Sequence, residues 1–393
     1  MPTTALDDQM REGIARVGRA DILVGIPSFN NAGTIGHVAA TVAEGIRRRF
    51  PDARAVIVNS DGGSKDGSSD VVARSTGDTP TITGAYVGIP GKGSAFHAIF
   101  EIAAALRPRA CAVVDSDLRS ITPEWIERLV GPIAEDTADY ITPLYARHKY
   151  DGTITNSIAY PLTRALYGVR LRQPIGGDFG FSGELAQAFL EQDVWETEVA
   201  KFGIDIYMTT TALVRRARVA QAFLGAKIHD PKDPGADLAP MFSQVVGTAF
   251  RMAAANRPIW QAVTGSHATK VIGDITPVEP EAVNASVGIL VEKFAAGRHE
   301  FAGRWAEILS APLPDRIEDE AWARIVYDFL IAAARQPERM AEDVRALVPL
   351  YFGRVAAFID RAKHLDTAGS ERLVERQAEA FEATKSHLAE HWA

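Results

Sequence analysis

The sequence predicts an α/β protein in which a doubly wound sheet is followed by an all-helical region. Short apolar runs alternate with helical segments in the first part of the chain, a pattern typical of parallel sheets covered by helices. From about residue 250, β-branched runs become rare and long stretches of Ala, Arg, Glu and Leu take over. We therefore expect two domains, residues 1–248 and residues 249–393.

Three apolar runs each end in a polar loop that leads into a helical segment. The runs span residues 21–27, 53–58 and 110–114, and the loops after them contain PSFNN, NSDGGSKDGSSD and DSD. After the first loop, residues 33–50 have helical spacing. After the third loop, Thr122 and Pro123 are typical of a helix start. Because ligands bind at the carboxyl ends of the strands in such sheets, the three loops are candidate parts of one site.

The carboxyl third is predicted to be all helical, with long helices over residues 341–365 and 370–393. Apolar residues recur at steps of three and four in the first of these, which predicts one buried helical face. They are Val344, Leu347, Val348, Tyr351, Phe352, Val355 and Phe358. Proline-containing segments at residues 275–281 and 311–315 are expected to connect helices.

Composition excludes several classes of protein. The 393 residues include 42 basic and 50 acidic ones, so the net charge of −8 argues against bulk attraction to nucleic acid or to anionic membranes. The most apolar stretch, residues 95–106, is interrupted by His97 and Glu101 and is shorter than the roughly 18 uncharged residues of a membrane span. The start of the chain lacks a signal-peptide core, and the single Cys111 excludes an internal disulfide. We expect a cytoplasmic protein without an integral membrane segment.

The strongest local signal is Asp115-Ser116-Asp117, directly after the third apolar run. Carboxylates two residues apart at a strand end can face one cleft, where one binds a divalent cation and the other orients a ribose or a metal-bound water. A solvated turn with a helix cap is the alternative for the tripeptide alone. Lys92 lies between glycines before a helical segment, where amides and an ammonium group can meet a diphosphate. The Lys92 segment lacks the Walker spacing, and the loop after the first apolar run lacks the GxGxxG fingerprint.

The order of PSFNN, NSDGGSKDGSSD, GKGSA and VVDSDLRS resembles nucleotide-sugar-dependent glycosyltransferases of the GT-A fold, of the family 2-like kind. In that fold an Asp-x-Asp motif holds a divalent metal on the donor diphosphate. RQPIGGD at residues 172–178, FGID at 202–205 and KIHD at 227–230 are similar to the retaining synthases of mannosylglycerate and of glucosyl- or mannosyl-3-phosphoglycerate. The resemblance covers about residues 20–250 and implies a hexosyltransferase that uses Mg²⁺ or Mn²⁺.

The resemblance also implies roles for single residues. Asp117 and His229 are implied as metal ligands, although a lone loop histidine is by itself more often simply solvated. In the retaining mechanism of the family, the carbonyl at Ile175 faces the anomeric carbon, Asp205 lies near the acceptor and sugar hydroxyls, and no side-chain nucleophile is required. The implied nucleotide-sugar contacts are Pro27, Ser28, Phe29, Asn31, Asp61, Lys92, Asp115, Ser116, Gly176 and Asp178.

For the acceptor, the segment GTITN at residues 152–156 matches the family segment that grips the glycerate carboxylate. The implied acceptor contacts are Arg147, Thr153, Thr155, Asn156 and Asp205. Phosphoglycerate-using members resemble GGRVTE here, so Thr153 stands where their phosphate-binding arginine would be. A threonine cannot make a bidentate ionic contact with phosphate. This departure favours glycerate, or a related small hydroxy acid, over 3-phosphoglycerate.

Three other functions stay open at this point. An inverting family 2-like transferase acting on a polysaccharide or lipid-linked acceptor needs a catalytic base, for which Asp178 and Asp205 are candidates. A sugar nucleotidyltransferase has a similar sheet but carries a glycine-rich loop after its first strand, where this chain has PSFNN. A non-enzymatic nucleotide-binding module is the third. UDP and GDP donors, and glucose and mannose, remain alternatives, and the helical region is expected either to form a homodimer or to close over the acceptor.

Overall fold

A computed structural model describes residues 4–228, 238–276 and 278–392. The chain forms two compact units. The first consists of Met1–Ala146, Ile175–Asp230 and Thr269–Val278, and the second of Arg147–Pro174, Pro231–Ala268 and Glu279–Ala393. The predicted boundary at residue 248 divides the sequence into two continuous parts. The two units, in contrast, are defined by contacts, and each consists of three separate segments of the chain.

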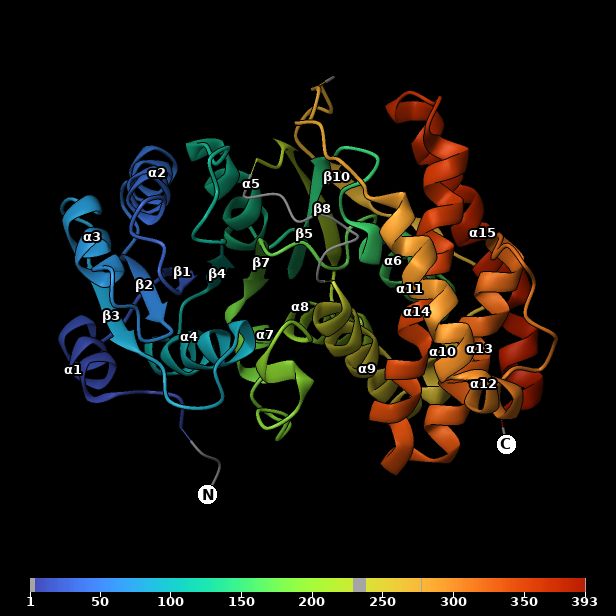
Figure 1. Cartoon of the computed structure of the whole chain (residues 1–393). Helices are drawn as coiled ribbons and strands as arrows, with labels where there is room; N and C mark the ends of the chain where they lie inside the picture. Colours follow the sequence, from blue (N-terminus) through green and yellow to red (C-terminus); the bar gives the residue numbers. More distant parts are fainter. Residues whose placement is uncertain (1–3, 229–237, 277, 393) are drawn as a thin grey trace. The chain divides into compact units, whose positions relative to one another are not determined.

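The first unit is built on an eight-stranded sheet with the order β10-β8-β5-β7-β4-β1-β2-β3 (Figure 1). The strands are β1 (Ile22–Ser28), β2 (Ala55–Asp61), β3 (Thr81–Ala85), β4 (Ala110–Val113), β5 (Tyr140–Ala146), β7 (Phe179–Ser182), β8 (Val219–Ala226) and β10 (Lys270–Ile272). Strand β7 pairs antiparallel with β4 and β5, and the other neighbours pair in parallel. The sheet is therefore mixed.

Helices cover both faces of this sheet (Figure 1). One face carries α2 (Ile35–Arg49), α3 (Ser68–Ser75) and α5 (Pro123–Ala134). The other carries α1 (Asp8–Val17), α4 (Lys92–Leu106), α7 (Gly183–Ala188), the 3₁₀ turn η2 (Glu198–Ala200) and α8 (Ile204–Val214). A continuous apolar cluster fills the space between the sheet and α2, α3 and α5. Burial on both faces explains why the central strands are apolar runs rather than alternating patterns.

The second unit is mainly helical. Its elements are the π-helix η1 (Thr155–Ala159), α6 (Tyr160–Tyr167), α9 (Ala239–Ala255), α10 (Arg257–Gln261), α11 (Val287–Glu300), α12 (Ala302–Ile308), α13 (Asp319–Arg335), the 3₁₀ turn η3 (Pro337–Arg339), α14 (Met340–Ala362), α15 (Thr367–His391), and a two-strand ladder of β6 (Val169–Arg170) and β9 (His267–Ala268). The predicted apolar face of α14 is buried. Burial extends around most of that helix, because α9, α11, α13 and α15 all pack on it. None of the helices in the described ranges is long and apolar enough to cross a membrane.

The predicted α/β fold with a helical carboxyl-terminal region is confirmed, with two differences in detail. The strand β7 has four residues and runs antiparallel to its neighbours, and an apolar run carries no signal of strand direction. The prediction that the carboxyl third is all helical is wrong for β9 and β10, which have two and three residues and carry no apolar run. Their pairing with distant strands, rather than local propensity, makes them strands.

The burial of His97 on helix α4 is expected to make the stability of the protein depend on pH. His97 is 6% exposed and stacks on Trp195, with ring centroids 4.0 Å apart. Burial lowers the pKa of His97 from 6.5 to about 4, and the charge of Asp193 offsets only part of this. Between these values the unfolded chain binds a proton that the folded chain does not, so the free energy of unfolding falls as the pH falls.

We expect His97→Phe, which keeps a ring on Trp195, to reduce the loss of stability between pH 7 and about pH 4. Urea unfolding midpoints measured across this range for both proteins give the comparison. Equal slopes for the variant and the wild type would contradict the prediction.

Candidate functional site

Polar residues from several strands meet at one edge of the sheet in the first unit. Strands β1, β2, β4, β5 and β8 run in the same direction, so their carboxyl ends lie at this edge. Strand β7 runs in the opposite direction, which brings the residues that precede it, Gly176–Asp178, to the same place. Lys92 and Asp205 lie in the first turns of α4 and α8. The topology therefore brings into contact residues that are more than 100 positions apart in the sequence, such as Asp115 and Lys227.

The loops after β1 and β2 are joined by Asp61, which is 4% exposed. Its Oδ2 atom accepts hydrogen bonds from the hydroxyls of Ser28 and Ser64, at 2.7 Å each. Its Oδ1 atom accepts from the amide of Gly63 at 2.8 Å. With both oxygens engaged, Asp61 shapes the loop that follows β2.

Asn31 joins the loop after β1 to the Asp115-Ser116-Asp117 motif. Its Oδ1 atom accepts from the amide of Phe29 at 3.0 Å and from the hydroxyl of Ser116 at 2.8 Å. Pro27 is buried within β1, whereas the Phe29 side chain beside it is 61% exposed. An exposed ring next to three polar loops gives a flat apolar surface on which a base can stack.

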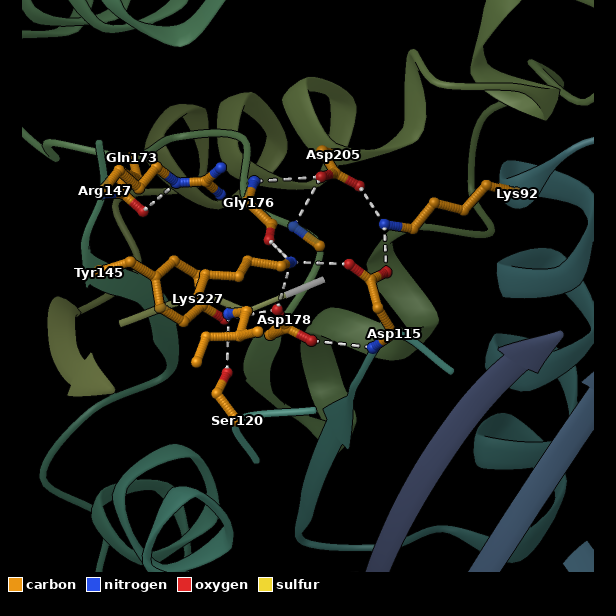
Figure 2. A network of polar contacts seen from close by, with 12 residues as sticks. Lys92, Asp115, Ser120, Tyr145, Arg147, Gln173, Gly176, Asp178, Asp205 and Lys227 are labelled. Carbon is orange, nitrogen blue, oxygen red and sulfur yellow. Dashed lines mark hydrogen bonds and ion pairs between the residues drawn. The ribbon is translucent and has the colours of Figure 1, made fainter. Parts of the chain in front are cut away.

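Two lysines hold Asp115 between them (Figure 2). Lys92 Nζ lies 2.8 Å from Asp115 Oδ1, and Lys227 Nζ lies 2.8 Å from Asp115 Oδ2. Lys227 also donates to the Gly176 carbonyl and to Asp178 Oδ2, at 2.8 Å each. One ammonium group, with its side chain 5% exposed, thus links the ends of β4 and β8 to the start of β7.

Asp178 is fully buried, and both of its oxygens accept hydrogen bonds (Figure 2). Oδ1 accepts from the amide of Asp115 at 2.8 Å, and Oδ2 accepts from the hydroxyl of Tyr145 as well as from Lys227. Both oxygens of Asp178 are thus engaged by protein groups.

The same contacts set the charges of the two carboxyls. Burial by itself raises the pKa of a carboxyl. At Asp115 the ammonium groups of Lys227 and Lys92 outweigh burial and hold the pKa well below its ordinary value. At Asp178 burial is the strongest influence, and it raises the pKa even though Lys227 acts against it. Asp115 is thus the carboxylate of this pair that keeps its negative charge.

Asp205 holds the loop that contains Ile175, Gly176 and Gly177. Its Oδ2 atom accepts from the amides of Gly176 and Gly177, at 3.1 and 2.9 Å. Lys92 Nζ lies 3.5 Å from its Oδ1 atom. Gly177 has φ +91°, and an added Cβ would come within 2.1 Å of Asp115 Oδ2. The loop therefore requires glycine at this position, both for its backbone conformation and for the approach of the carboxylate.

The structure describes one of the two predicted metal ligands, Asp117. Asp117 is half-buried after β4, and within the described ranges its carboxylate makes no hydrogen bond or ion pair. His229 lies outside the described residues. Ile228, which precedes it in the sequence, accepts from the Arg119 amide and donates its amide to the hydroxyl of Ser120, both at 3.0 Å. Across the described parts of the chain, no three His, Cys, Asp or Glu side chains are grouped to hold a metal ion.

The predicted acceptor residues other than Asp205 belong to the second unit. Arg147 donates from Nη1 to Asp151 Oδ2 at 2.9 Å. Thr153 and Thr155 are 3% and 5% exposed. Asn156 is half-buried, and its Oδ1 atom accepts from Arg172 at 2.8 Å.

Sequence reasoning assigned no role to Lys227 or Tyr145. A signal for Lys227 was present, because it follows the apolar run of β8 just as Asp115 follows β4. Tyr145 carried no such signal, because a tyrosine in a strand is ordinary core packing. Its contact with Asp178 depends on the antiparallel β7, which the sequence did not reveal.

A comparison with known protein families finds a match for part of the first unit and for the start of the second unit. Residues 23–182 match the family described as Glycosyl transferase family 2. The match confirms the predicted family resemblance over a range that includes the loops after β1, β2 and β4 and the segment before β7. Asp205 and Lys227 lie beyond it. No curated protein matches the chain.

Solved structures of glucosyl-3-phosphoglycerate synthase from Mycobacterium tuberculosis are similar to the chain. One, in complex with Mn²⁺, UDP and glucosyl-3-phosphoglycerate, is 24% identical, with 62% of this chain and 83% of that chain covered and a TM-score of 0.48. Another, with Mg²⁺ and UDP, is 22% identical, with 64% and 85% covered and a TM-score of 0.47.

The contacts of Lys227 generate a stability prediction. Lys227→Met keeps the length of the side chain but removes a buried positive charge that Asp115 and Asp178 share. Removing one partner of a buried ion pair costs about 3–5 kcal/mol. We expect a loss of this size in the free energy of unfolding, measured with urea. Lys65→Met, at an exposed lysine, is the control, and equal stability of the two variants would refute the prediction.

Proposed function

We propose that the protein is a metal-dependent, retaining glycosyltransferase. It moves a hexose, glucose or mannose, from a UDP- or GDP-sugar to glycerate or a related small hydroxy acid. The observation that carries the proposal is the half-buried Asp117 carboxylate, without a partner among the described residues, at the strand edge of a family 2 glycosyltransferase domain.

The charges at this edge support a cation. Asp115, Asp117 and Asp205 bring three carboxylates to this edge, and within the described ranges the ammonium groups that form ion pairs there are those of Lys92 and Lys227. Both ammonium groups are already engaged with Asp115. A diphosphate brought to this edge needs a further positive charge, and oxygen ligands suit Mg²⁺ and Mn²⁺.

Asp117 and His229 are the residues proposed to hold that ion. The contacts of Ile228 with Arg119 and Ser120 keep the chain just before His229 beside the loop that carries Asp117. A carboxylate and an imidazole, with diphosphate oxygens, form a donor set that both ions accept. When bound, the ion neutralises the charge that develops on the departing diphosphate.

The donor is bound by groups from the three loops. Phe29 offers its exposed ring to the base, and Asp61, Asn31 and Ser116 keep the loops around it in place. Lys92, at the start of α4, places positive charge beside Asp115. These roles follow the predicted nucleotide-sugar contacts, with Asp61 acting through the loop that it shapes.

The contacts of Asp178 and Asp205 support a retaining reaction in which no side chain acts as the nucleophile. Both oxygens of Asp178 accept hydrogen bonds in a fully buried position, and Asp205 uses Oδ2 to hold two amides. Asp205 thereby positions the segment that begins at Ile175, whose carbonyl is proposed to face the anomeric carbon. The acceptor hydroxyl attacks on the face that the diphosphate leaves, and the diphosphate takes its proton.

The state of Thr153 supports an acceptor without phosphate. The side chain is 3% exposed and its hydroxyl is bonded to the buried hydroxyl of Tyr351, so the position has no room for a long cationic side chain. Position 153 therefore does not accommodate an arginine that could bind a phosphate.

The function is tested with a matrix of UDP-glucose and GDP-mannose against glycerate and 3-phosphoglycerate, with Mg²⁺ or Mn²⁺ and with EDTA. We expect transfer to glycerate with one donor, loss of transfer in EDTA, and an α-linked product from an α-linked donor by NMR. An inverted anomer would favour the polysaccharide-type alternative, and activity that survives exhaustive EDTA treatment would refute the metal requirement.

The proposed metal ligands are tested by substitution. We expect Asp117→Ala and His229→Ala each to abolish transfer and the effect of Mn²⁺ on the melting temperature, without lowering the melting temperature of the metal-free protein. Asp70→Ala and His299→Ala, at exposed positions, are the matched controls. Turnover near the wild-type rate in either ligand variant would exclude that residue as a ligand.

A further inference from the structure

The acceptor segment enters a helix through an unusual turn. Gly152 has φ +64°, a conformation that favours glycine, and residues 153 and 154 begin a helix that becomes the π-helix η1 before continuing as α6. In a π-helix the main-chain bonds span five residues instead of four, and such turns are rare and are often found at functional sites. The widened turn leaves carbonyl oxygens that side chains can bind.

Two of these carbonyls are bound by side chains of the carboxyl-terminal helices. Gln377 on α15 donates from Nε2 to the Asn156 carbonyl at 2.5 Å. Trp322 on α13 donates from Nε1 to the Ser157 carbonyl at 2.6 Å. Trp322 is fully buried and Gln377 is 3% exposed, so neither bond competes with water.

Arg354 fixes the orientation of the Gln377 amide. Its Nε donates to Gln377 Oε1 at 2.5 Å, and Arg354 itself is fully buried. Because a guanidinium group can only donate, the amide oxygen must face it, and the NH₂ group must then face the Asn156 carbonyl.

A third bond joins the segment to α14. The hydroxyls of Thr153 and Tyr351 lie 2.7 Å apart, and Tyr351 is fully buried and stacked on Phe242 with ring centroids 4.4 Å apart. Upstream of the segment, Lys149 donates to the carbonyls of Ala362 and Leu365, at 2.9 and 2.8 Å, at the end of the same helix. Three helices thus contact the segment along its length.

We propose that Tyr351, Trp322 and Gln377 are positioning residues for the acceptor. They hold the backbone of residues 153–157 and the hydroxyl of Thr153 in the arrangement that binds the acceptor carboxylate. The inference rests on the proposed function, because that function assigns the segment to the acceptor. The carboxyl-terminal helices are then part of acceptor recognition, and substitutions in them weaken acceptor binding while leaving the donor residues of the first unit unchanged.

The test uses substitutions that remove one hydrogen-bonding group and keep an aromatic ring at the position. Tyr351→Phe and Trp322→Phe remove the bonds to Thr153 and Ser157. Tyr327→Phe and Trp305→Phe are the matched controls, because these buried side chains make single bonds to the carbonyls of Phe381 and Ala346, on α15 and α14. Gln377→Met replaces either test variant if one does not fold.

We expect the KM for the acceptor to rise about three- to tenfold in the two test variants, as the loss of one hydrogen bond predicts. The kcat, the KM for the donor and the affinity for the nucleoside diphosphate of the preferred donor should stay at wild-type values, which a general loss of structure would not allow. Without substrates, amide hydrogen exchange of residues 153–160 should be faster in the test variants than in the controls.

The outcomes separate this inference from the proposed function. If the wild type transfers a hexose and the test variants match the controls in acceptor KM and in exchange, the inference is overturned and the function stands. If the wild type transfers to no acceptor, the proposed function fails and the acceptor role of these residues fails with it. If exchange rises but acceptor KM does not, the bonds are structural only, and the inference is overturned.

Discussion

The buried ammonium group of Lys227 is the contact on which the candidate site depends. It binds a charged carboxylate at the end of β4, a buried carboxyl before β7 and the Gly176 carbonyl. All three groups carry negative or partial negative charge, so they would repel one another without a cation between them. Without the lysine, Asp115 and Asp178 would face each other with only Lys92 to balance Asp115. The shape of the Gly176–Asp178 loop therefore depends on the same group that sets the charges around it.

The direction of one short strand decides which residues take part. Strand β7 runs against its neighbours, so the segment before it, rather than the segment after it, reaches the carboxyl edge of the parallel strands. Asp205 then holds this segment through two amides, and Tyr145 at the end of β5 donates to Asp178. A purely parallel sheet would place residues 176–178 at the opposite edge, away from Asp115.

The helical unit contributes specific buried hydrogen bonds as well as packing. In it, α13 and α15 donate hydrogen bonds to main-chain carbonyls of a π-helical turn, and Tyr351 on α14 shares a hydrogen bond with the hydroxyl of Thr153 just before that turn. Such bonds fix the backbone shape of residues 153–157, on which the proposed acceptor role depends. The sequence pattern of α14 indicated a buried face, and the structure adds that one residue of that face, Tyr351, also has a polar task.

The sequence by itself determined the class of fold, the loops after β1, β2 and β4, and the family resemblance, because each depends on local runs and on motifs that are contiguous in the chain. Only the tertiary structure decided that Asp178 is buried with both oxygens bonded, that Lys227 links three segments, and that residues 152–156, the proposed acceptor segment, belong to the helical unit. The reason is physical. Burial, charge balance and strand direction depend on groups that are far apart in the sequence, and a motif of a few residues carries no information about the partners that folding brings to it.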